Sequence, residues 1–228
     1  MNKSFAKIVA TVGPASAAAD NIRLLHDVGV SAFRLNFSHG SHADHARAVK
    51  NIRETSRLSG NAIAIIADMQ GPKLRVGPFE DGSVELKYGE TVRIELSGEL
   101  GVPGIIRVSH PELFGALSEG DQLKFDDGKL LVTVTETHNK AVSARVDVPG
   151  TLSDRKGINV IGAVLPMSAM TPKDREDMAF ALSQNVDFIA LSFVQTPQDV
   201  LDAREIIGDK AGIIVKIEKP SAVDSLYE

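Results

Sequence analysis

The chain has 228 residues, of which 43% are hydrophobic, and this allows one or two domains with a substantial core. Its net charge of −5 argues against nucleic acid as a partner, and the absence of cysteine excludes disulfides and thiolate zinc sites. The sequence has no run of about 18 apolar residues, and residues 1–13 lack the long apolar core of a signal peptide. We therefore expect a cytoplasmic protein with no membrane segment.

The first part of the chain alternates predicted strands with predicted helices. Ser16 is a candidate N-cap for a helix that ends at Gly29, and Ser41 is a candidate N-cap for a helix that ends near Leu58, before Gly60. Strands alternating with helices indicate βαβ units and a parallel sheet. The predicted strands lie at residues 7–13, 32–38 and within 61–70.

The pattern changes after Gly71-Pro72, where short alternating strands follow one another without a long amphipathic helix. Turn signals such as Asp81-Gly82 and Asp127-Gly128 separate them. This region predicts a small all-β barrel domain inserted after the third strand of an α/β domain. Its candidate strands are residues 84–88, 91–96, 105–109, 121–125, 129–135 and 141–148.

The α/β pattern then returns. Thr171-Pro172 and Thr196-Pro197 each begin a predicted helix, with an aspartate three residues after the threonine. Predicted strands four and five occupy residues 187–194 and the segment IIVKIE. We expect three segments, namely barrel residues 1–71 with strands 1–3, cap residues 72–166, and barrel residues 167–228 with strands 4 and 5.

The fifth predicted strand, within residues 212–220 (GIIVKIEKP), carries two charges where a buried parallel strand is normally apolar. Lys216 and Glu218 lie two residues apart and so share a face, at the carboxyl end where α/β folds bind ligands. One interpretation is a structural ion pair. The other is a lysine near transferred charge beside a glutamate that holds a divalent cation.

The segment AFRLNFS places Arg34, Asn36 and Ser38 on one face and apolar side chains on the other. This alternation fits an antiparallel strand with a solvated face. It also fits a buried parallel strand, on which Arg34 is an anion site and the other two supply oxygens for a cation or a ligand hydroxyl. The neighbouring βα pattern favours the parallel strand.

The third predicted strand ends at Asp68, followed by a Gly-Pro that prevents a helix, so we interpret Asp68 as a ligand rather than a cap. Lys73 and Arg75 lie at the domain junction, either as surface charges or in a cleft. His39, His42 and His45 have a spacing that could suggest a metal. We favour a solvent-facing helix for the last two, because no carboxylate completes a ligand set.

Taken together, these segments resemble the pyruvate kinases. The motifs KIVATVGPAS, FRLNFSHG, ADMQGPKLRVG, RKGINV, LPMSAMTPKD, DFIALSFV and VKIEKP occur in the family's order across the chain. The resemblance implies a (β/α)8 TIM-type barrel, incomplete in this chain, with a β cap domain inserted after the third strand. It also implies Mg²⁺-dependent phosphoryl transfer from phosphoenolpyruvate to ADP in glycolysis, giving pyruvate and ATP. A homo-oligomer, namely a tetramer, is implied for the full-length enzyme.

The resemblance also implies roles for the matching residues. Arg34 and Lys216 would bind substrate, with Lys216 stabilising the transferring phosphoryl group and the enolate. Glu218 would hold Mg²⁺, or Mn²⁺ in its place. The remaining roles are a monovalent-cation position at Asn36, Ser38 and Asp68, and nucleotide contacts at Asn36, Arg75 and Lys156.

The sequence differs from the family pattern in two places, and each difference leads to an expectation. Met69-Gln70 and Lys73 resemble the subgroup that works without K⁺, and the Lys73 ammonium could supply the charge that K⁺ gives elsewhere. The family's later Ala-Arg-Gly-Asp motif, with its second magnesium carboxylate, is not in the sequence. We therefore expect the 228-residue chain alone to be inactive or nearly so, and prone to aggregate.

Two other functions stay open on the sequence. One is another barrel enzyme acting on phosphoenolpyruvate or pyruvate, such as an aldolase or lyase, against which the inserted β domain argues. The other is a non-catalytic fragment that binds phosphoenolpyruvate or a partner. Phosphate transfer to ADP, rather than carbon–carbon cleavage, would separate the enzymes.

Overall fold

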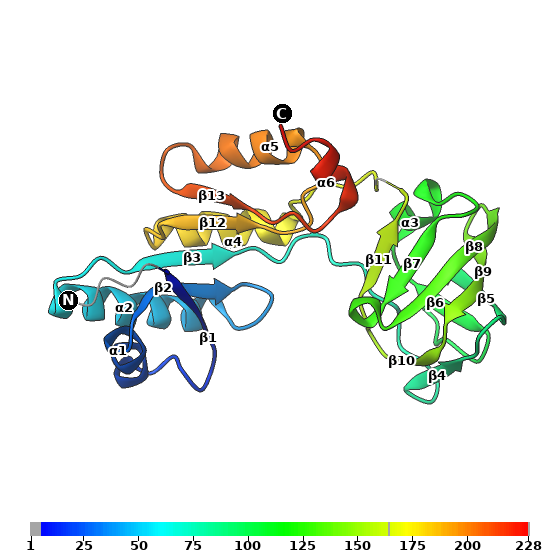
Figure 1. The fold of residues 1–228 in the computed structure, drawn as a ribbon, viewed down its shortest axis with the longest axis horizontal. Coiled ribbons are helices and arrows are strands. Elements are labelled where there is room, and N and C mark those ends of the chain that lie inside the picture. Colours follow the sequence, from blue (N-terminus) through cyan, green and yellow to red (C-terminus); the bar gives the residue numbers. More distant parts are fainter. Residues whose placement is uncertain (1–5, 164, 228) are drawn as a thin grey trace. The chain divides into compact units, whose positions relative to one another are not determined.

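A computed structural model describes residues 6–163 and 165–227 (Figure 1). The described chain divides into two compact units at Pro72/Lys73 and at Met167/Ser168. The α/β unit comprises the residues up to Pro72 and from Ser168 onward, and the β unit comprises Lys73–Met167. No helix in these described ranges is both long enough and apolar enough to cross a membrane.

The α/β unit is built on a five-stranded sheet in the order β1-β2-β3-β12-β13. Every neighbouring pair in it is parallel, and Figure 1 shows β3, β12 and β13 side by side. The parallel pairing of β2 on both sides excludes the antiparallel interpretation of the segment around Arg34. The strands are β1 (Ile8–Val12), β2 (Val30–Asn36), β3 (Ala64–Asp68), β12 (Phe188–Leu191) and β13 (Gly212–Val215).

Short polar motifs set the ends of the helices in this unit. Ser41 caps α2 in a capping box with Asp44, and Gly60 ends α2 with a φ of 70°, as the sequence predicts. The capping boxes at Thr171 and Thr196 are also confirmed. The helices are α1 (Ala19–Asp27), α2 (His42–Ser59), α4 (Pro172–Ser183), α5 (Pro197–Ile207) and α6 (Pro220–Asp224).

The first predicted cap is wrong. The N-cap of α1 is Ala18, whereas Ser16 accepts a hydrogen bond from the Gly13 backbone at 2.9 Å and closes a turn before the helix. A serine near a helix start can satisfy either a turn or a cap, and local spacing does not decide between them.

One face of the sheet packs against the helices. Phe33, Leu35 and Ile65 are at most 1% exposed and belong to one apolar cluster with residues from α2, α4 and α5, such as Ile52 and Met178. Since side chains alternate along a strand, the residues between them lie on the opposite face. The helix-covered face therefore supplies the core of this unit, and the other face is left for polar groups.

The predicted fifth strand is shorter and less buried than expected. β13 ends at Val215, so Lys216 and Glu218 lie just after the strand, and all four of its residues are only partly buried. In the described sheet β13 is an edge strand, which explains its exposure despite its apolar sequence. The backbone of Lys216 still donates to the Leu191 carbonyl at 3.1 Å, which holds it against the end of β12.

The β unit contains a six-stranded sheet in the order β11-β7-β8-β9-β5-β6 and a two-stranded sheet of β4 and β10. A short helix, α3 (Pro111–Ala116), makes it mostly β rather than all-β, because Pro111 at the first turn favours a helix start there. The strands are β4 (Ser83–Leu86), β5 (Thr91–Leu96), β6 (Ile105–Val108), β7 (Gln122–Phe125), β8 (Leu130–His138), β9 (Ala141–Val148), β10 (Gly150–Ser153) and β11 (Ile158–Ile161).

Candidate functional site

A row of polar side chains crosses the open face of the parallel sheet near its carboxyl end. The strand register places Asn36 beside Asp68, Asp68 beside Ala190, and Ala190 beside Ile214. Lys216 lies two residues after Ile214 and therefore on the same face. Ala190, which lies between Asp68 and Ile214 in this register, has only a methyl side chain.

The carboxylate of Asp68 is the centre of this row. It is 2% exposed and receives the Arg34 Nε at 2.5 Å on Oδ2, while the Lys216 Nζ lies 2.7 Å from Oδ1. The lysine contact lacks hydrogen-bond geometry, so Oδ1 is a buried acceptor without a hydrogen-bond donor among the described groups. Arg34 also donates through Nη1 to Thr11 at 3.1 Å. Two cations thus converge on one buried carboxylate.

Lys216 is closer to Asp68 than to Glu218, its partner in the structural ion-pair interpretation. Its Nζ lies 3.9 Å from Glu218 Oε1, which is a longer contact than that with Asp68. Asp68 and Lys216 were assigned separately on the sequence, and only the register of β3, β12 and β13 brings them together. Both cationic side chains stay about one-third exposed, which leaves their remaining donors accessible to an anionic ligand.

The backbone just after β12 holds the Glu218 carboxylate, and this backbone is strained at Phe193. Its Oε2 accepts the Phe193 N–H at 3.0 Å, and Phe193 has a φ of 56°, which is rare for a bulky residue. Gly71 packs against this turn so closely that a Cβ there would lie 2.9 Å from the Phe193 ring. Burial lowers the pKa of the neighbouring Lys219, whereas the Glu218 charge opposes that shift.

The end of β2 forms a tight turn. Asn36 Oδ1 accepts the Ser38 backbone N–H at 3.0 Å, and the Asn36 carbonyl accepts the His39 N–H at 3.2 Å. The side-chain oxygen of Asn36 is therefore already engaged within the turn. The predicted monovalent-cation position at Asn36, Ser38 and Asp68 stays a prediction.

A cavity of about 900 Å³ lies beside this turn, within the α/β unit. Its walls come from the β1–α1 loop, the end of β2 and the first turns of α2, including Pro14, Asn36, His39 and Arg47. The sequence signal that could have indicated it is the Gly13-Pro14 after β1, since a ligand crevice lies outside the carboxyl ends of parallel strands. From the sequence, His39 is a candidate only through its metal-like spacing with His42 and His45.

The predicted nucleotide contacts of the β unit lie around one acidic turn. Lys156 Nζ is 2.9 Å from Asp126 Oδ1, and Arg75 donates to the Arg155 carbonyl at 3.0 Å. The Lys73 side chain packs near Gly157, whose Cβ, if present, would lie 3.4 Å from its Cε. Lys73 belongs to the β unit and Asp68 to the α/β unit, so replacement of K⁺ by Lys73 stays a prediction.

The predicted solvent-facing histidines are partly wrong. His45 is 9% exposed, and its ring stacks on Phe37 with centroids 4.1 Å apart. His42 is half-exposed, but its Nε2 lies 2.7 Å from Asp177 of α4. Packing of α2 against α4 buries this side of α2, which the polar sequence at its start does not indicate.

The described residues contain no group of three or more His, Asp or Glu side chains placed to hold a metal ion. Glu218 offers one partly exposed carboxylate, whereas both oxygens of Asp68 face cationic side chains, those of Arg34 and Lys216. Magnesium binds proteins through one or two carboxylates and completes its sphere with waters and substrate phosphates. The donor set therefore fits a magnesium site that relies on its substrate.

A family model described as the barrel domain of pyruvate kinase matches residues 3–228. The chain belongs to the pyruvate kinase family. The five-stranded sheet is accordingly part of a barrel, and the β unit is inserted in it after β3. The parallel-barrel and inserted-domain fold class that the sequence predicts is confirmed, with the short helix α3 as its correction.

Curated pyruvate kinases give the same family. The chain is 47% identical over 223 residues to one from Agrobacterium vitis, and that match covers 97% of this chain and 47% of the relative. It is 40% identical to one from Corynebacterium glutamicum and 39% identical to one from Geobacillus stearothermophilus, covering 47% and 39% of those proteins. The chain thus spans about half the length, or less, of the curated relatives it matches.

Proposed function

We propose that this chain carries the phosphoenolpyruvate and divalent-cation sites of a pyruvate kinase, a phosphotransferase of glycolysis. The reaction is transfer of a phosphoryl group from phosphoenolpyruvate to ADP, giving pyruvate and ATP. The observation that supports it most is the convergence of Arg34 and Lys216 on Asp68 at the carboxyl end of the sheet. Family membership supports the same reaction.

Arg34 and Lys216 provide fixed positive charge for an anionic substrate. In phosphoryl transfer most of the catalysis comes from positioning and from charge stabilisation, for which a guanidinium and an ammonium are suited. Asp68 keeps both cations in place, because it is buried and, among the described residues, forms ion pairs with these two alone. Lys216 is then available to stabilise negative charge on the transferring phosphoryl group and on the enolate.

Glu218 is the proposed magnesium ligand, and Mn²⁺ could take the same place. The bound ion would neutralise phosphate charge. The Phe193 N–H restrains one oxygen of this carboxylate and leaves the other for the ion and its waters. A second protein carboxylate is not assigned.

The cavity beside Asn36 is the proposed seat of the ADP nucleoside. Its volume of about 900 Å³ lies within the range of small-molecule sites, and its lining combines apolar residues with polar and charged ones such as Asn36, His39 and Arg47. By resemblance, Arg75 and Lys156 of the β unit are also proposed nucleotide contacts. Lys156 would have to exchange Asp126 for the nucleotide phosphates.

Three finer proposals rest on the resemblance alone. K⁺ is not required, because Lys73 supplies the corresponding charge, and a rate that rises many-fold when KCl replaces a tetramethylammonium salt would contradict this. The full-length enzyme is a homo-oligomer, namely a tetramer. The protein acts in the cytoplasm, where glycolysis takes place.

The proposed roles are tested by Lys216→Met and Glu218→Gln. Turnover is measured in the chain extended by the remaining residues of the Agrobacterium vitis relative, with phosphoenolpyruvate, ADP and Mg²⁺. We expect Lys216→Met to lower kcat by more than roughly a thousandfold, since it removes a charge from the reacting phosphoryl group. Glu218→Gln should mainly raise the Mg²⁺ concentration needed for half-maximal rate.

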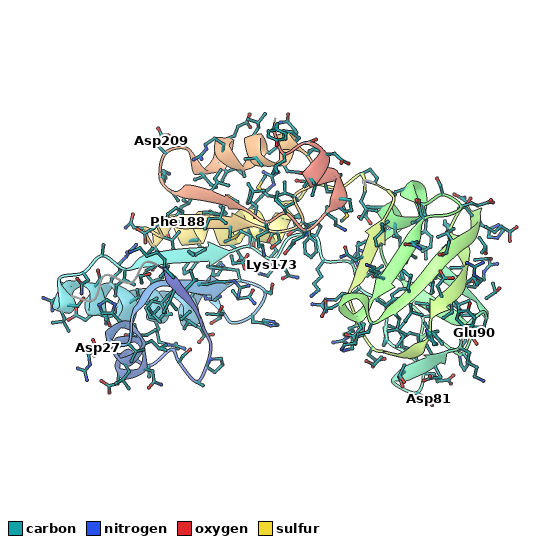
Figure 2. The ribbon with its side chains drawn as sticks, in the orientation of Figure 1. Asp27, Asp81, Glu90, Lys173, Phe188 and Asp209 are labelled. Atoms are coloured by element: carbon teal, nitrogen blue, oxygen red, sulfur yellow. The ribbon has the colours of Figure 1, made fainter. Side chains whose placement is uncertain are left out.

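Lys210→Met is the matched control. Lys210 is exposed and follows Asp209 (Figure 2) in the loop before β13, at the amino end of the sheet, whereas Asp68 and Lys216 lie at the carboxyl end. Its loss should leave kcat within a few-fold of the parent. Full turnover by Lys216→Met would contradict the proposal, and carbon–carbon cleavage without ATP formation would favour the aldolase or lyase alternative. Binding of phosphoenolpyruvate without any reaction would favour the non-catalytic alternative.

A further inference from the structure

A buried histidine forms part of the cavity wall, and the proposed reaction does not use it. His45 is on the first turn of α2, is 9% exposed and lines the cavity. Its ring stacks on Phe37, with an interplanar angle of 22°, and Phe37 is itself 3% exposed. A polar ring that is placed this deeply normally has a hydrogen-bonding reason to be there.

The hydrogen bond of His45 goes to the backbone of the neighbouring turn. Its Nε2 lies 3.0 Å from the His39 carbonyl oxygen. A carbonyl oxygen only accepts, so Nε2 carries the proton and donates. His45 therefore ties α2 to the loop that follows β2.

That loop turns sharply at Gly40, which also lines the cavity. Gly40 has a φ of 80°, and a Cβ at Gly40 would lie 3.5 Å from His45 Nε2, so the imidazole edge packs directly under the glycine. Asn36 already holds the Ser38 and His39 amides from the other side. The turn is thus restrained by Asn36 at its start and by His45 at its end.

The platform under His45 is anchored in a different helix. Lys173 of α4 donates to the Phe37 carbonyl at 2.9 Å, and the ring of Phe180 lies 6.3 Å from the ring of Phe37. The Phe37 ring therefore cannot move away without disturbing α4. A stack on a fixed ring also fixes the direction in which His45 points.

We propose that His45 is a positioning residue for nucleotide binding, which acts by holding the His39–Gly40 turn in the shape that forms the cavity wall. This inference rests on the proposed seating of ADP in that cavity. His45 touches no reacting atom in this role, and its effect passes through His39 and Gly40. Loss of the donor should loosen the turn and weaken ADP binding, while the transfer step in the bound complex changes little.

The test separates the hydrogen bond from the stack. His45→Phe keeps an aromatic ring on Phe37 and removes the donor, whereas His45→Gln keeps a donor and removes the ring. His42→Phe is the control, because His42 is on the same helix turn and stacks on Phe180 but does not line the cavity. Amide hydrogen exchange at Ser38 and His39 and calorimetric titration with Mg-ADP are measured on the full chain.

For His45→Phe we expect roughly tenfold faster exchange at Ser38 and His39 and roughly three- to tenfold weaker ADP binding, the size of one lost hydrogen bond. His45→Gln should lie closer to the parent in both measurements. Exchange at these amides that is unchanged in His45→Phe, or equally faster in His42→Phe, overturns the proposal. If His45→Phe does not fold, parent-like exchange and binding in His45→Gln still support a donor role, and losses as large as tenfold overturn it.

A parent chain that does not bind ADP would instead contradict the nucleotide site itself. The exchange measurement needs no ligand, so in that case it still decides whether His45 holds the turn. The two proposals therefore fail in different experiments.

Discussion

On the helix-covered face of the parallel sheet, Phe33 and Leu35 are almost completely buried among apolar side chains, whereas on the opposite face their neighbour Arg34 pairs with Asp68. The same strands therefore build the core and the site. Burial of apolar area stabilises the first face. The second face gains little from its ion pairs after the cost of desolvation, and it keeps polar groups in place for a ligand. Stability and function are thus separated by the one-residue alternation of a strand.

The largest expected effect on stability is at Phe33, and it is compared with that at the adjacent Arg34, which lies on the opposite face of β2. Phe33→Ala should lower the free energy of unfolding by roughly 3–5 kcal/mol, because it leaves a cavity at a fully buried site. Arg34→Ala should cost roughly 1–2 kcal/mol, since Lys216 still neutralises Asp68, but it should abolish binding of phosphoenolpyruvate. Urea unfolding and titration with phosphoenolpyruvate measure the two effects. An Arg34→Ala protein that unfolds as easily as Phe33→Ala would make Arg34 a structural residue.

An intermediate effect is expected at Asp68. Asp68→Asn keeps the size of the side chain but leaves Arg34 and Lys216 facing each other without a negative charge between them. We expect a loss of roughly 1–3 kcal/mol in unfolding free energy. This loss is smaller than for a fully buried ion pair, because both cations are about one-third exposed. Added phosphate should restore part of this stability in Asp68→Asn more than in the parent. Identical stabilisation of both proteins by phosphate would argue against an anion site between the two cations.

The smallest effect concerns pH and lies on the helix-covered side. Burial is the main cause that lowers the pKa of His45 from its ordinary value near 6.5, and the nearby His42 acts in the same direction. The His39 carbonyl, Asp177 and Asp44 oppose the shift. Below about pH 6.5 the unfolded chain binds a proton at His45 that the native chain does not yet bind. The contribution of His45 to the unfolding free energy is therefore fully present above pH 6.5 and is lost as the pH falls toward the native pKa.

The parent should therefore lose more stability than His45→Phe between pH 7.5 and pH 5.5. Urea midpoints of the two proteins at both pH values measure this, and other titrating groups cancel in the difference. An equal loss in both proteins would mean that His45 titrates normally, and the apolar environment assigned to it would be wrong.

Much of the fold was predictable because its signals are local. The N-caps at Ser41, Thr171 and Thr196 are local signals, the last two reinforced by an aspartate three residues later, and Gly60 marks the end of α2. Ser16 shows the limit of such signals, since a serine can satisfy a turn as well as a cap. The length of β13 was also misjudged, because an apolar sequence does not show whether a strand has a neighbour on both sides.

The sequence by itself determined the family, the α/β order with its inserted β region, and the identity of the charged residues at the strand ends, because motifs and alternation are written in neighbouring residues. Only the tertiary structure decided which charges meet. Lys216 pairs more closely with Asp68 than with nearby Glu218, because the register of β3, β12 and β13 brings the two side chains to one end of the sheet. His45 became a buried support of the cavity wall for the same reason. Pairing between distant segments depends on register and packing, which no local pattern contains.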